Sequence, residues 1–283
     1  MKIGFASDLH IEFQPLEIYN TEKADVLILA GDIILASRLY DKSERHFLGD
    51  REFQCGSSDR FHAFFQQVCE EFPHVVYVFG NHESYNDDIA NTYSYIKEKL
   101  SYLKNLHVLE KETFQLDDVT FICGTMWTDF DNNDEYGMGL ISRRMNDFQI
   151  IKNSNKRLPN DVWTPTFTPQ DAYEDHQLFM KFAKNELNND DNRKVVMVTH
   201  HGPSKICIPE KYKGYEFAIM NPGYVSNLED FILDHPKIRA WVCGHSHRRL
   251  DAMIGSTNIL MNCRGYAGME SMADTFELKY FEV

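Results

Sequence analysis

The sequence has no long apolar run, no paired-cysteine motif and no glycine-rich nucleotide fingerprint. No apolar stretch approaches the roughly 18 residues that a membrane-spanning helix needs, so no membrane association is expected. The cysteines are widely spread without a C-x-x-C pair, which favours free thiols over disulfide bonds or a structural zinc site. Gly137 and Gly139 do not follow a strand in the G-x-G-x-x-G manner. Because Met1 is followed at once by a predicted strand, we expect no signal peptide and a cytoplasmic location.

Positive charge is also scarce, with 29 Lys and Arg against 43 Asp and Glu and a net charge of −14. Proteins hold duplex DNA mainly through many cationic contacts to phosphate, so this balance disfavours a nuclease. Local pairs such as Arg143-Arg144 and Arg248-Arg249 still leave a nuclease open. The chain of 283 residues, with 43% hydrophobic and 25% charged residues, has the composition of an ordinary globular protein with a sizeable core.

Five short apolar runs each end at a residue that can bind a metal ion. Rich in Val, Ile and Phe, they are typical of strands buried on both faces of a sheet. The runs and the residues that follow them are IGFAS with Asp8 and His10, VLILAG with Asp32, VVYVFG with Asn81, His82 and Glu83, VVMVT with His200 and His201, and AWVCG with His245 and His247. Active sites of open α/β sheets gather beyond the carboxyl ends of strands, so these five ends predict one shared site. Its oxygen and imidazole groups suit one or two divalent transition-metal ions.

Two of these segments carry their polar residues at alternate positions, Asp8 with His10 and His245 with His247. On extended backbone, residues i and i+2 point to the same side, so each pair could present two ligands together. Cutting the chain anywhere between 32 and 200 would split the predicted site. We therefore expect a single domain over residues 1–283.

Helical and strand patterns alternate along the rest of the chain, which predicts an α/β fold. Helices are expected over 58–72, where apolar residues follow i, i+3, i+4 spacing, over 87–104, from Thr168 to 187, and after Ser226. Further strands are expected over 107–109, 119–123, 250–254, 258–262 and 275–282. Loops are expected over 12–24, 35–56, 131–139 and 202–225, the last arching over the site.

Each candidate residue also has an ordinary structural interpretation. An Asp after a strand often forms a turn, Asn81 to Glu83 could cap a helix, and His200 and His201 could belong to a loop. Two histidines at one strand end, as in the GHSH segment, are harder to explain by packing. The joint occurrence at five separate strand ends favours the metal site.

In this order, D-x-H, G-D, G-N-H-E, H and G-H-x-H resemble the calcineurin-like metallophosphoesterase superfamily, and the resemblance spans residues 1 to about 265. The segments GTMWTDF (124–130), RRMNDF (143–148), VTHHGPS (198–204) and NCRGYAG (262–268) look like a group of bacterial and phage members whose substrates are mostly undefined. The resemblance implies a four-layer α/β/β/α sandwich of two mixed sheets flanked by helices. A dinuclear metal site would lie at the carboxyl ends of the strands.

The resemblance also implies roles for individual residues. One metal ion would take Asp8, His10, Asp32 and His247, and the other would take Asp32, Asn81, His200 and His245, so that Asp32 bridges them. His82 would be catalytic without binding metal, as a proton donor to the leaving oxygen or a stabiliser of phosphoryl charge. The chain departs from the family at Leu35, where a second Asp often supports the site from outside the ligand shell.

Substrate contacts carry a weaker signal. Arg264 is a candidate phosphate contact, with Arg143 and Arg144 as weaker candidates, and each could equally form a surface ion pair. Asn81 and His201 are further candidates, His201 from a position beside the ligands.

The sequence thus predicts an enzyme that hydrolyses a small or exposed phosphoester through a hydroxide bridging two divalent ions. Mn²⁺ is expected first, although mixed Asp, Asn and His ligation also accommodates Fe, Zn²⁺ or Ni²⁺. Phosphomonoesters and phosphodiesters both stay open, and a nuclease comes third. A non-catalytic scaffold is the alternative from another class, disfavoured because every ligand position and His82 are filled. The oligomeric state stays open.

Overall fold

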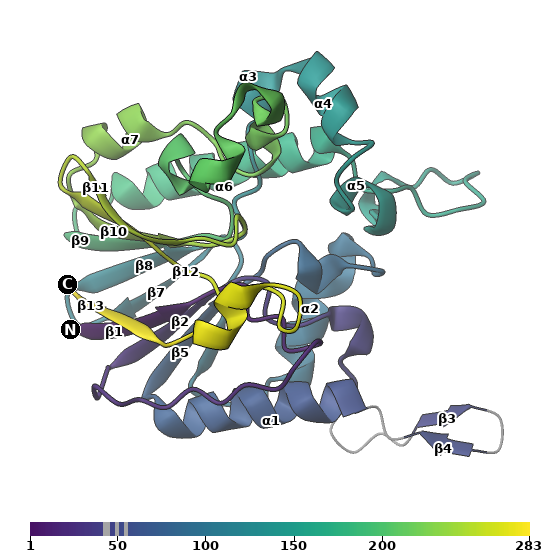
Figure 1. The fold of residues 1–283 in the computed structure, drawn as a ribbon, viewed down its shortest axis with the longest axis horizontal. Coiled ribbons are helices and arrows are strands. Elements are labelled where there is room, and N and C mark those ends of the chain that lie inside the picture. The colour runs from purple at the N-terminus through teal and green to yellow at the C-terminus, as the bar shows by residue number, and fades with distance from the viewer. Residues whose placement is uncertain (42–45, 49–50, 54–55) are drawn as a thin grey trace.

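Two mixed β-sheets face each other at the centre of the fold, and helices cover their outer faces (Figure 1). The computed structural model describes residues 1–41, 46–48, 51–53 and 56–283. The first sheet consists, in spatial order, of β13 (Lys279–Glu282), β1 (Lys2–Ala6), β2 (Val26–Ala30), β5 (His74–Val78) and β6 (Leu106–Val108). The second consists of β11 (Arg249–Ile254), β12 (Thr257–Asn262), β10 (Ile238–Cys243), β9 (Lys194–Val198), β8 (Val119–Cys123) and β7 (Glu112–Leu116).

The inner strands of both sheets run parallel. In the first sheet β1, β2, β5 and β6 are parallel and β13 is antiparallel to β1. In the second, β8, β9, β10 and β12 are parallel, and β7 and β11 pair antiparallel at the two edges. Parallel strands bring their carboxyl ends to one edge of a sheet, so the segments after β1, β2, β5, β9 and β10 meet there.

The fold has four layers, two sheets with helices on each outer face, and a cluster of apolar side chains fills each of the three interfaces between them. Between the sheets lie small and branched residues of the strands, among them Ile28, Val196 and Val242. The outer face of the first sheet packs against α1 (Gly56–Glu71) and α2 (Ile89–Lys99), as Figure 1 shows. The outer face of the second packs against α6 (Pro169–Leu187) and α7 (Glu229–Asp234). This arrangement confirms the predicted sandwich of two mixed sheets flanked by helices.

A separate apolar cluster lies beyond the end of the sheets. It includes Trp127, Phe148 and Phe167, and involves α3 (Phe130–Asn133), α4 (Glu135–Ile141) and α5 (Asp147–Ile150). Of these, α3 is a left-handed turn, with φ between 49° and 66° from Phe130 to Asn133. The sequence prediction of a loop over 131–139 was wrong for α4, because the Asp134 side chain caps that helix by accepting from the backbone N–H groups of Tyr136 and Gly137.

Further local differences from the prediction have identifiable causes. Strand β7 lies between two predicted strands, in a segment for which no strand was expected. Its alternating half-buried and exposed residues suit an edge strand. The predicted loop over 35–56 contains a 3₁₀ turn (Ala36–Arg38) and the paired strands β3 (His46–Leu48) and β4 (Arg51–Phe53), and the rest of it lies partly outside the described residues.

The helix caps predicted at Thr168 and at Ser226 have different outcomes. Thr168 and Asp171 form a reciprocal capping box at the start of α6. Helix α7 is present, but Ser226 does not cap it, because its hydroxyl accepts from the backbone N–H of Asp129 instead.

The segment between β9 and α7, predicted as a loop, is built of short 3₁₀ turns: Lys205–Cys207, Glu210–Tyr212, Tyr215–Phe217 and Asn221–Gly223. Further 3₁₀ turns occupy His82–Ser84, Ser154–Lys156 and Ser271–Thr275. Within the described ranges, the cysteines are free thiols, as expected, and no helix is long and apolar enough to cross a membrane.

Candidate metal centre

The segments that follow β1 and β2 stay hydrogen-bonded to each other after the strands end. The backbone N–H of Asp8 donates to Gly31 (2.9 Å) and that of His10 donates to Asp32 (3.0 Å). At the end of the second sheet, the N–H of Gly244, after β10, donates to the carbonyl of His200, after β9 (2.8 Å). The N–H of His245 donates to the Asp8 carboxylate (2.9 Å), which links the segment after β10 to the segment after β1 in the first sheet. These bonds fix the strand ends of both sheets relative to each other.

The backbone of the predicted ligands differs from the extended form expected for the pairs Asp8 with His10 and His245 with His247. Asp8, His10, Asp32, His245 and His247 have φ of 51°, 47°, 57°, 70° and 46°, so they are left-handed rather than extended. This region costs non-glycine residues of order 1–3 kcal/mol each, although Asp and His tolerate it better than most. Strain of this kind persists only where the surrounding structure enforces it, and it clusters at functional sites.

Close approach of backbone to side chains explains the glycines that precede Asp32 and Asn81. Gly31 has a φ of 84°, and a Cβ there would overlap the imidazole of His200. A Cβ at Gly80 would overlap the Asp32 carboxylate and the same imidazole. Any larger residue at either position would therefore displace the predicted ligands.

The first cluster contains Asp8, His10 and His247. The Nε2 atoms of the two histidines lie 3.2 Å apart, and His247 Nε2 is 3.5 Å from the Asp8 carboxylate. The Nδ1 atom of His10 lies 3.2 Å from Glu12 and that of His247 lies 2.5 Å from Glu270. Carboxylates accept hydrogen bonds, so Nδ1 of each histidine carries the proton of the neutral ring. Each Nε2 then has a free lone pair, and the lone pairs of His10 and His247 point at each other. A cation between them would resolve that repulsion.

The second cluster contains Asp32, His200 and His245, with Asn81 beside them. His200 donates from Nδ1 to the Ala30 carbonyl (2.9 Å), which turns Nε2 toward Asn81 Oδ1 (3.1 Å) and Asp32 Oδ1 (3.4 Å). Burial lowers the His200 pKa, but the Asp32 charge and hydrogen bond outweigh it and raise the pKa to about 10. The buried Nε2 of His245 has no hydrogen-bond partner. The residues present thus fit a divalent cation, which would take the lone pairs of His245 Nε2 and of the oxygens and displace the proton from His200 Nε2.

The orientation of the Asn81 amide is set by Asp147 and Tyr85. Its Nδ2 donates to the Asp147 carboxylate (2.6 Å) and to the Tyr85 hydroxyl (3.0 Å), so Oδ1 faces the second cluster. Burial raises the pKa of Asp147, which is almost fully enclosed. Sequence reasoning missed this support, although Asp147 lies in the RRMNDF segment.

Asp32 lies between the two clusters. Its Oδ1 is 3.4 Å from His200 Nε2, and its Oδ2 is 3.8 Å from His10 Nε2. Burial raises the Asp32 pKa, but the charges on His200 and His82 outweigh it and hold the pKa well below its usual value. The carboxylate is therefore ionised, with one oxygen directed at each cluster.

Glu83 ties the segments that carry Asp32 and Asn81 together. Its fully buried carboxylate accepts from the backbone N–H groups of Asp32 (3.1 Å), Ile33 (2.8 Å) and Gly80 (2.8 Å), and from the Tyr77 hydroxyl (2.8 Å). Burial, together with the Asp32 charge, raises the Glu83 pKa to about 7. The G-N-H-E motif contains this residue, but nothing in the motif alone assigns it a positioning role.

His82 projects beside both clusters. Its backbone N–H donates to Asp32 (2.9 Å), its Nε2 is 3.2 Å from the Tyr266 hydroxyl, and its ring stacks on Tyr85 at 4.1 Å between centroids. Burial lowers its pKa, but the charge of Asp32 and a contact with Glu12 outweigh it and raise the pKa to about 9. Imidazole that stays protonated here can donate a proton to a leaving group.

Glu12 contacts both His10 and His82 on the ring nitrogens that do not face the clusters. Its side chain is 4% exposed, with Oε1 3.2 Å from His10 Nδ1 and 3.6 Å from His82 Nδ1. Leu35, where the family often has its second Asp, is buried and carries no polar group. Sequence reasoning missed Glu12, although Asp8, His10 and Glu12 continue the same alternate spacing.

Three of the predicted substrate contacts, Arg264, His201 and Arg143, do not line the cavity at this site. Arg264 is buried, and its guanidinium donates to the carbonyls of Leu9 and Gln14 (both 3.1 Å), so it holds the segment after β1. His201 is fully buried between the rings of Trp127 and His245. Arg143 is exposed outside the cavity, whereas its neighbour Arg144 lines it.

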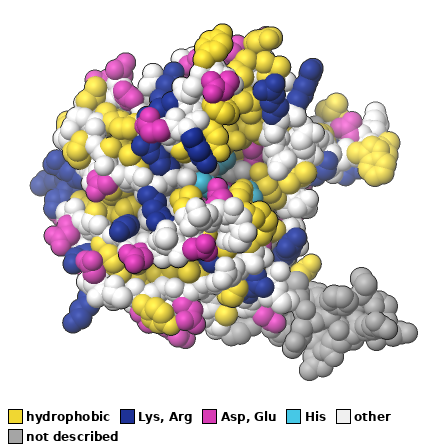
Figure 2. Space-filling view, in the orientation of Figure 1, with side chains coloured by type: hydrophobic (Ala, Val, Ile, Leu, Met, Phe, Trp, Pro, Cys, Tyr) yellow, Lys and Arg dark blue, Asp and Glu magenta, His cyan; other side chains and the backbone are white. Residues whose placement is uncertain are grey.

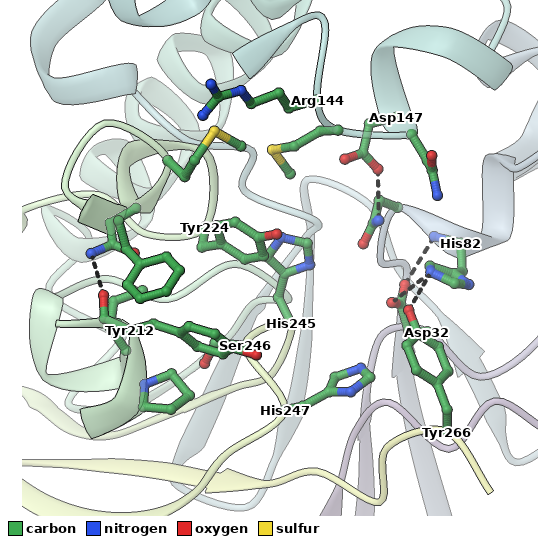
Figure 3. A pocket seen from close by; sticks show the side chains of 18 of the residues that line it. Asp32, His82, Arg144, Asp147, Tyr212, Tyr224, His245, Ser246, His247 and Tyr266 are labelled. Atoms are coloured by element: carbon green, nitrogen blue, oxygen red, sulfur yellow. Dashed lines mark hydrogen bonds and ion pairs between the residues drawn. The ribbon is translucent and has the colours of Figure 1, made fainter. Parts of the chain in front are cut away.

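The cavity has a volume of about 470 Å³. Its lining includes Asp32, Asn81, His82, His245 and His247, and this part of the lining is called the metal floor below. Figure 2 shows histidine atoms in a depression near the centre of this face. In Figure 3, Asp32, His82 and Tyr266 lie on one side, with Tyr212 and Tyr224 on the other. A small organic molecule therefore has access to the floor.

Comparisons with known proteins place these features in a family. A family model described as "Calcineurin-like phosphoesterase" matches residues 1–249. An "Uncharacterized protein" of Acanthamoeba polyphaga mimivirus is 27% identical over 290 residues, which cover 94% of this chain and 91% of that protein. The crystal structure of a phosphopantetheinyl hydrolase from Mycobacterium tuberculosis has a TM-score of 0.64 at 16% identity, covering 99% of this chain and 95% of the other. At that identity the likeness extends to the fold alone.

Proposed function

The chain belongs to the calcineurin-like phosphoesterase family, and we propose that it hydrolyses a small phosphoester with the help of two divalent metal ions. The proposed ligands are Asp8, His10, Asp32 and His247 for one ion, and Asp32, Asn81, His200 and His245 for the other. We propose that residues 1–283 work as one metallophosphoesterase domain, because these ligands come from both sheets.

The observation that carries the proposal is the position of Asp32 between the two clusters. Its two carboxylate oxygens face His200 and His10 separately, at 3.4 and 3.8 Å. A carboxylate so placed can bridge two cations and neutralise part of their mutual repulsion. A site for one ion would not need the second set of histidines on the far side of the same carboxylate.

When bound, two such ions supply the Lewis acidity that makes water nucleophilic at neutral pH and that stabilises phosphoryl charge. The chain's own residues orient the reacting groups. Asn81, fixed by Asp147, presents an oxygen toward the floor, and His82, held by Glu12 and Asp32, donates a proton to the leaving oxygen. Arg144 is the cation among the predicted contacts that reaches the cavity.

Monoesters and diesters are both compatible with this floor. A nuclease stays third, and a non-catalytic scaffold is disfavoured because the ligand positions are filled and converge. Manganese as the first choice of metal and a cytoplasmic location stay predictions.

The proposal is tested by elemental analysis of purified protein combined with hydrolysis of p-nitrophenyl phosphate and bis-p-nitrophenyl phosphate in Mn²⁺. We expect two equivalents of metal and turnover of at least one compound. Asp32→Asn should reduce both metal content and turnover, while Asp230→Asn, an exposed change on α7, should alter neither. Two bound equivalents without hydrolysis of either compound would favour the scaffold interpretation.

A further inference from the structure

The cavity continues beyond the metal floor along the segment between β9 and α7. Tyr224, Tyr212 and Phe217 of this segment line it, and the Tyr224 ring begins the wall, 4.9 Å from the ring of the proposed ligand His245. A group attached to a phosphoryl group on the floor would therefore lie next to an aromatic surface.

The far part of this wall is a fixed pair of rings. Tyr212 and Phe217 meet edge to face, with centroids 5.2 Å apart and planes at 77°. The side-chain amide of Asn221 donates to the Tyr212 carbonyl at 3.0 Å, which anchors that turn. Tyr212 is nevertheless 40% exposed, with Lys211 Nζ over its ring at 4.7 Å from the centroid, so part of the aromatic side chain stays accessible. Burying such a ring against another is favourable.

Methionines also line the cavity. Met145, Met220 and Met272 all contribute to its lining, and Figure 3 shows two thioether sulfurs between Arg144 and Tyr224. Thioethers adapt to the shape of a neighbour and make favourable sulfur contacts at the edge of an aromatic ring. Aromatic rings and thioethers together suit a flat ring better than a polar sugar or a short alkyl group.

We propose that this region is a leaving-group subsite, and that the substrate is a phosphoester whose alcohol carries an aromatic ring. The inference rests on the proposed function, since the phosphoryl group must sit on the metal floor for the ring to reach this wall. Hydrolysis breaks the P–O bond to the ring-bearing alcohol, water supplies the new P–O bond, and the alcohol leaves with a proton. The cavity of about 470 Å³ is large enough for a phosphoryl group with one ring.

The test uses leaving groups that differ in the ring but little in basicity. Propyl, hexyl and benzyl phosphates are compared, each as monoester and as methyl diester, with the Mn²⁺-loaded full-length protein. A methylene separates the benzyl ring from oxygen, so intrinsic reactivity changes little across the series. We expect kcat/KM for benzyl to exceed that for propyl roughly ten- to hundredfold, through burial and ring contacts.

Variants of Tyr212 test whether this wall is responsible. Tyr212→Ala should lower the benzyl-to-propyl ratio by roughly fivefold or more, and Tyr212→Phe should keep it. Tyr215→Ala is the matched control, because Tyr215 is in the same segment, 96% exposed and outside the cavity lining. Metal content and thermal stability are measured for each variant, and the ratio is independent of the fraction of active protein.

The outcomes separate the inference from the function on which it rests. Hydrolysis of propyl and benzyl esters at equal kcat/KM would overturn the subsite and leave the phosphoesterase in place. An equal increase in kcat/KM for the hexyl ester would show that the subsite accepts any apolar group, and would overturn the inference of an aromatic leaving group. A ratio unchanged in Tyr212→Ala would also overturn it. If no ester in any series is hydrolysed by metal-loaded protein, the proposed function itself is wrong.

Discussion

Replacing Glu83 by Gln should destabilise the fold strongly, although the two side chains have nearly the same shape. Oε2 of Glu83 accepts from the N–H groups of Asp32 and Gly80, and Oε1 accepts from the N–H of Ile33 and the Tyr77 hydroxyl. An amide has one oxygen only. With its NH₂ in place of Oε2, the amide faces two backbone N–H donors in a fully buried site. With its NH₂ in place of Oε1, it faces the Ile33 N–H and the Tyr77 hydroxyl, which can turn to accept, so one donor is left unpaired.

The expected loss follows from the bonds that the amide cannot make. In the less costly orientation the Ile33 N–H loses a hydrogen bond to a charged group, which contributes about 1.5–3 kcal/mol, and leaving this buried donor unpaired costs roughly 1–3 kcal/mol more. Removing a buried charge offsets part of this, which moves the expectation toward about 3 kcal/mol. Since domains are stable by only about 5–15 kcal/mol, the change should be large in any denaturation experiment.

The assay is urea denaturation of metal-free protein at pH 8, above the Glu83 pKa of about 7. Glu98→Gln, an exposed change on α2, is the control and should alter the unfolding free energy by less than about 0.5 kcal/mol. If Glu83→Gln lowered the unfolding free energy by less than about 1 kcal/mol with an unchanged m-value, Glu83 would not hold the segments that carry Asp32 and Asn81 together.

Three further predictions concern His82 and the carboxylate that contacts it, Glu12. Glu12→Gln should lower kcat roughly 10- to 100-fold with little change in KM, whereas Glu17→Gln, exposed in the same segment, should not; equal kcat in both variants would exclude the support role. His82→Ala should keep both metal ions by elemental analysis and lose roughly 10²- to 10⁴-fold in kcat, and unaltered turnover on every active substrate would remove His82 from the mechanism. In metal-free protein the His82 pKa is raised from 6.5 to about 9, so its contribution to stability is complete below pH 6.5 and is lost as the pH rises to 9. The loss, on the order of 3 kcal/mol, should appear as a Tm that falls more steeply in wild type than in His82→Gln, and parallel curves would contradict it.

The parts of the fold that the sequence predicted are those where burial alone determines structure. Strand β8 has the predicted bounds, because a run of apolar residues buried on both faces has few alternatives. Edge strand β7 and helix α4 were missed, because their conformations depend on a neighbouring strand and on one capping side chain, Asp134. Periodicity carries neither signal.

The candidate site shows the same limit at the level of side chains. The residues that the sequence placed at strand ends do converge, because parallel strands bring those ends together. Their left-handed backbone was not predicted, since it is enforced by contacts across both sheets rather than by local preference. Glu12 and Asp147 were missed for a similar reason. Glu12 contacts His82 and Asp147 contacts Asn81, and both partners are far away in the chain. Arg264 was assigned by its residue type, and its burial against backbone carbonyls could not be read from the sequence.

The most direct test of the two-ion site is anomalous diffraction from crystals grown with Mn²⁺. We predict two manganese peaks per chain, roughly 3.5–4 Å apart, with one oxygen of Asp32 bound to each. One peak should lie among Asp8, His10 and His247, and the other among Asn81, His200 and His245. A single peak at full occupancy under excess Mn²⁺, or two peaks that do not share Asp32, would contradict the account.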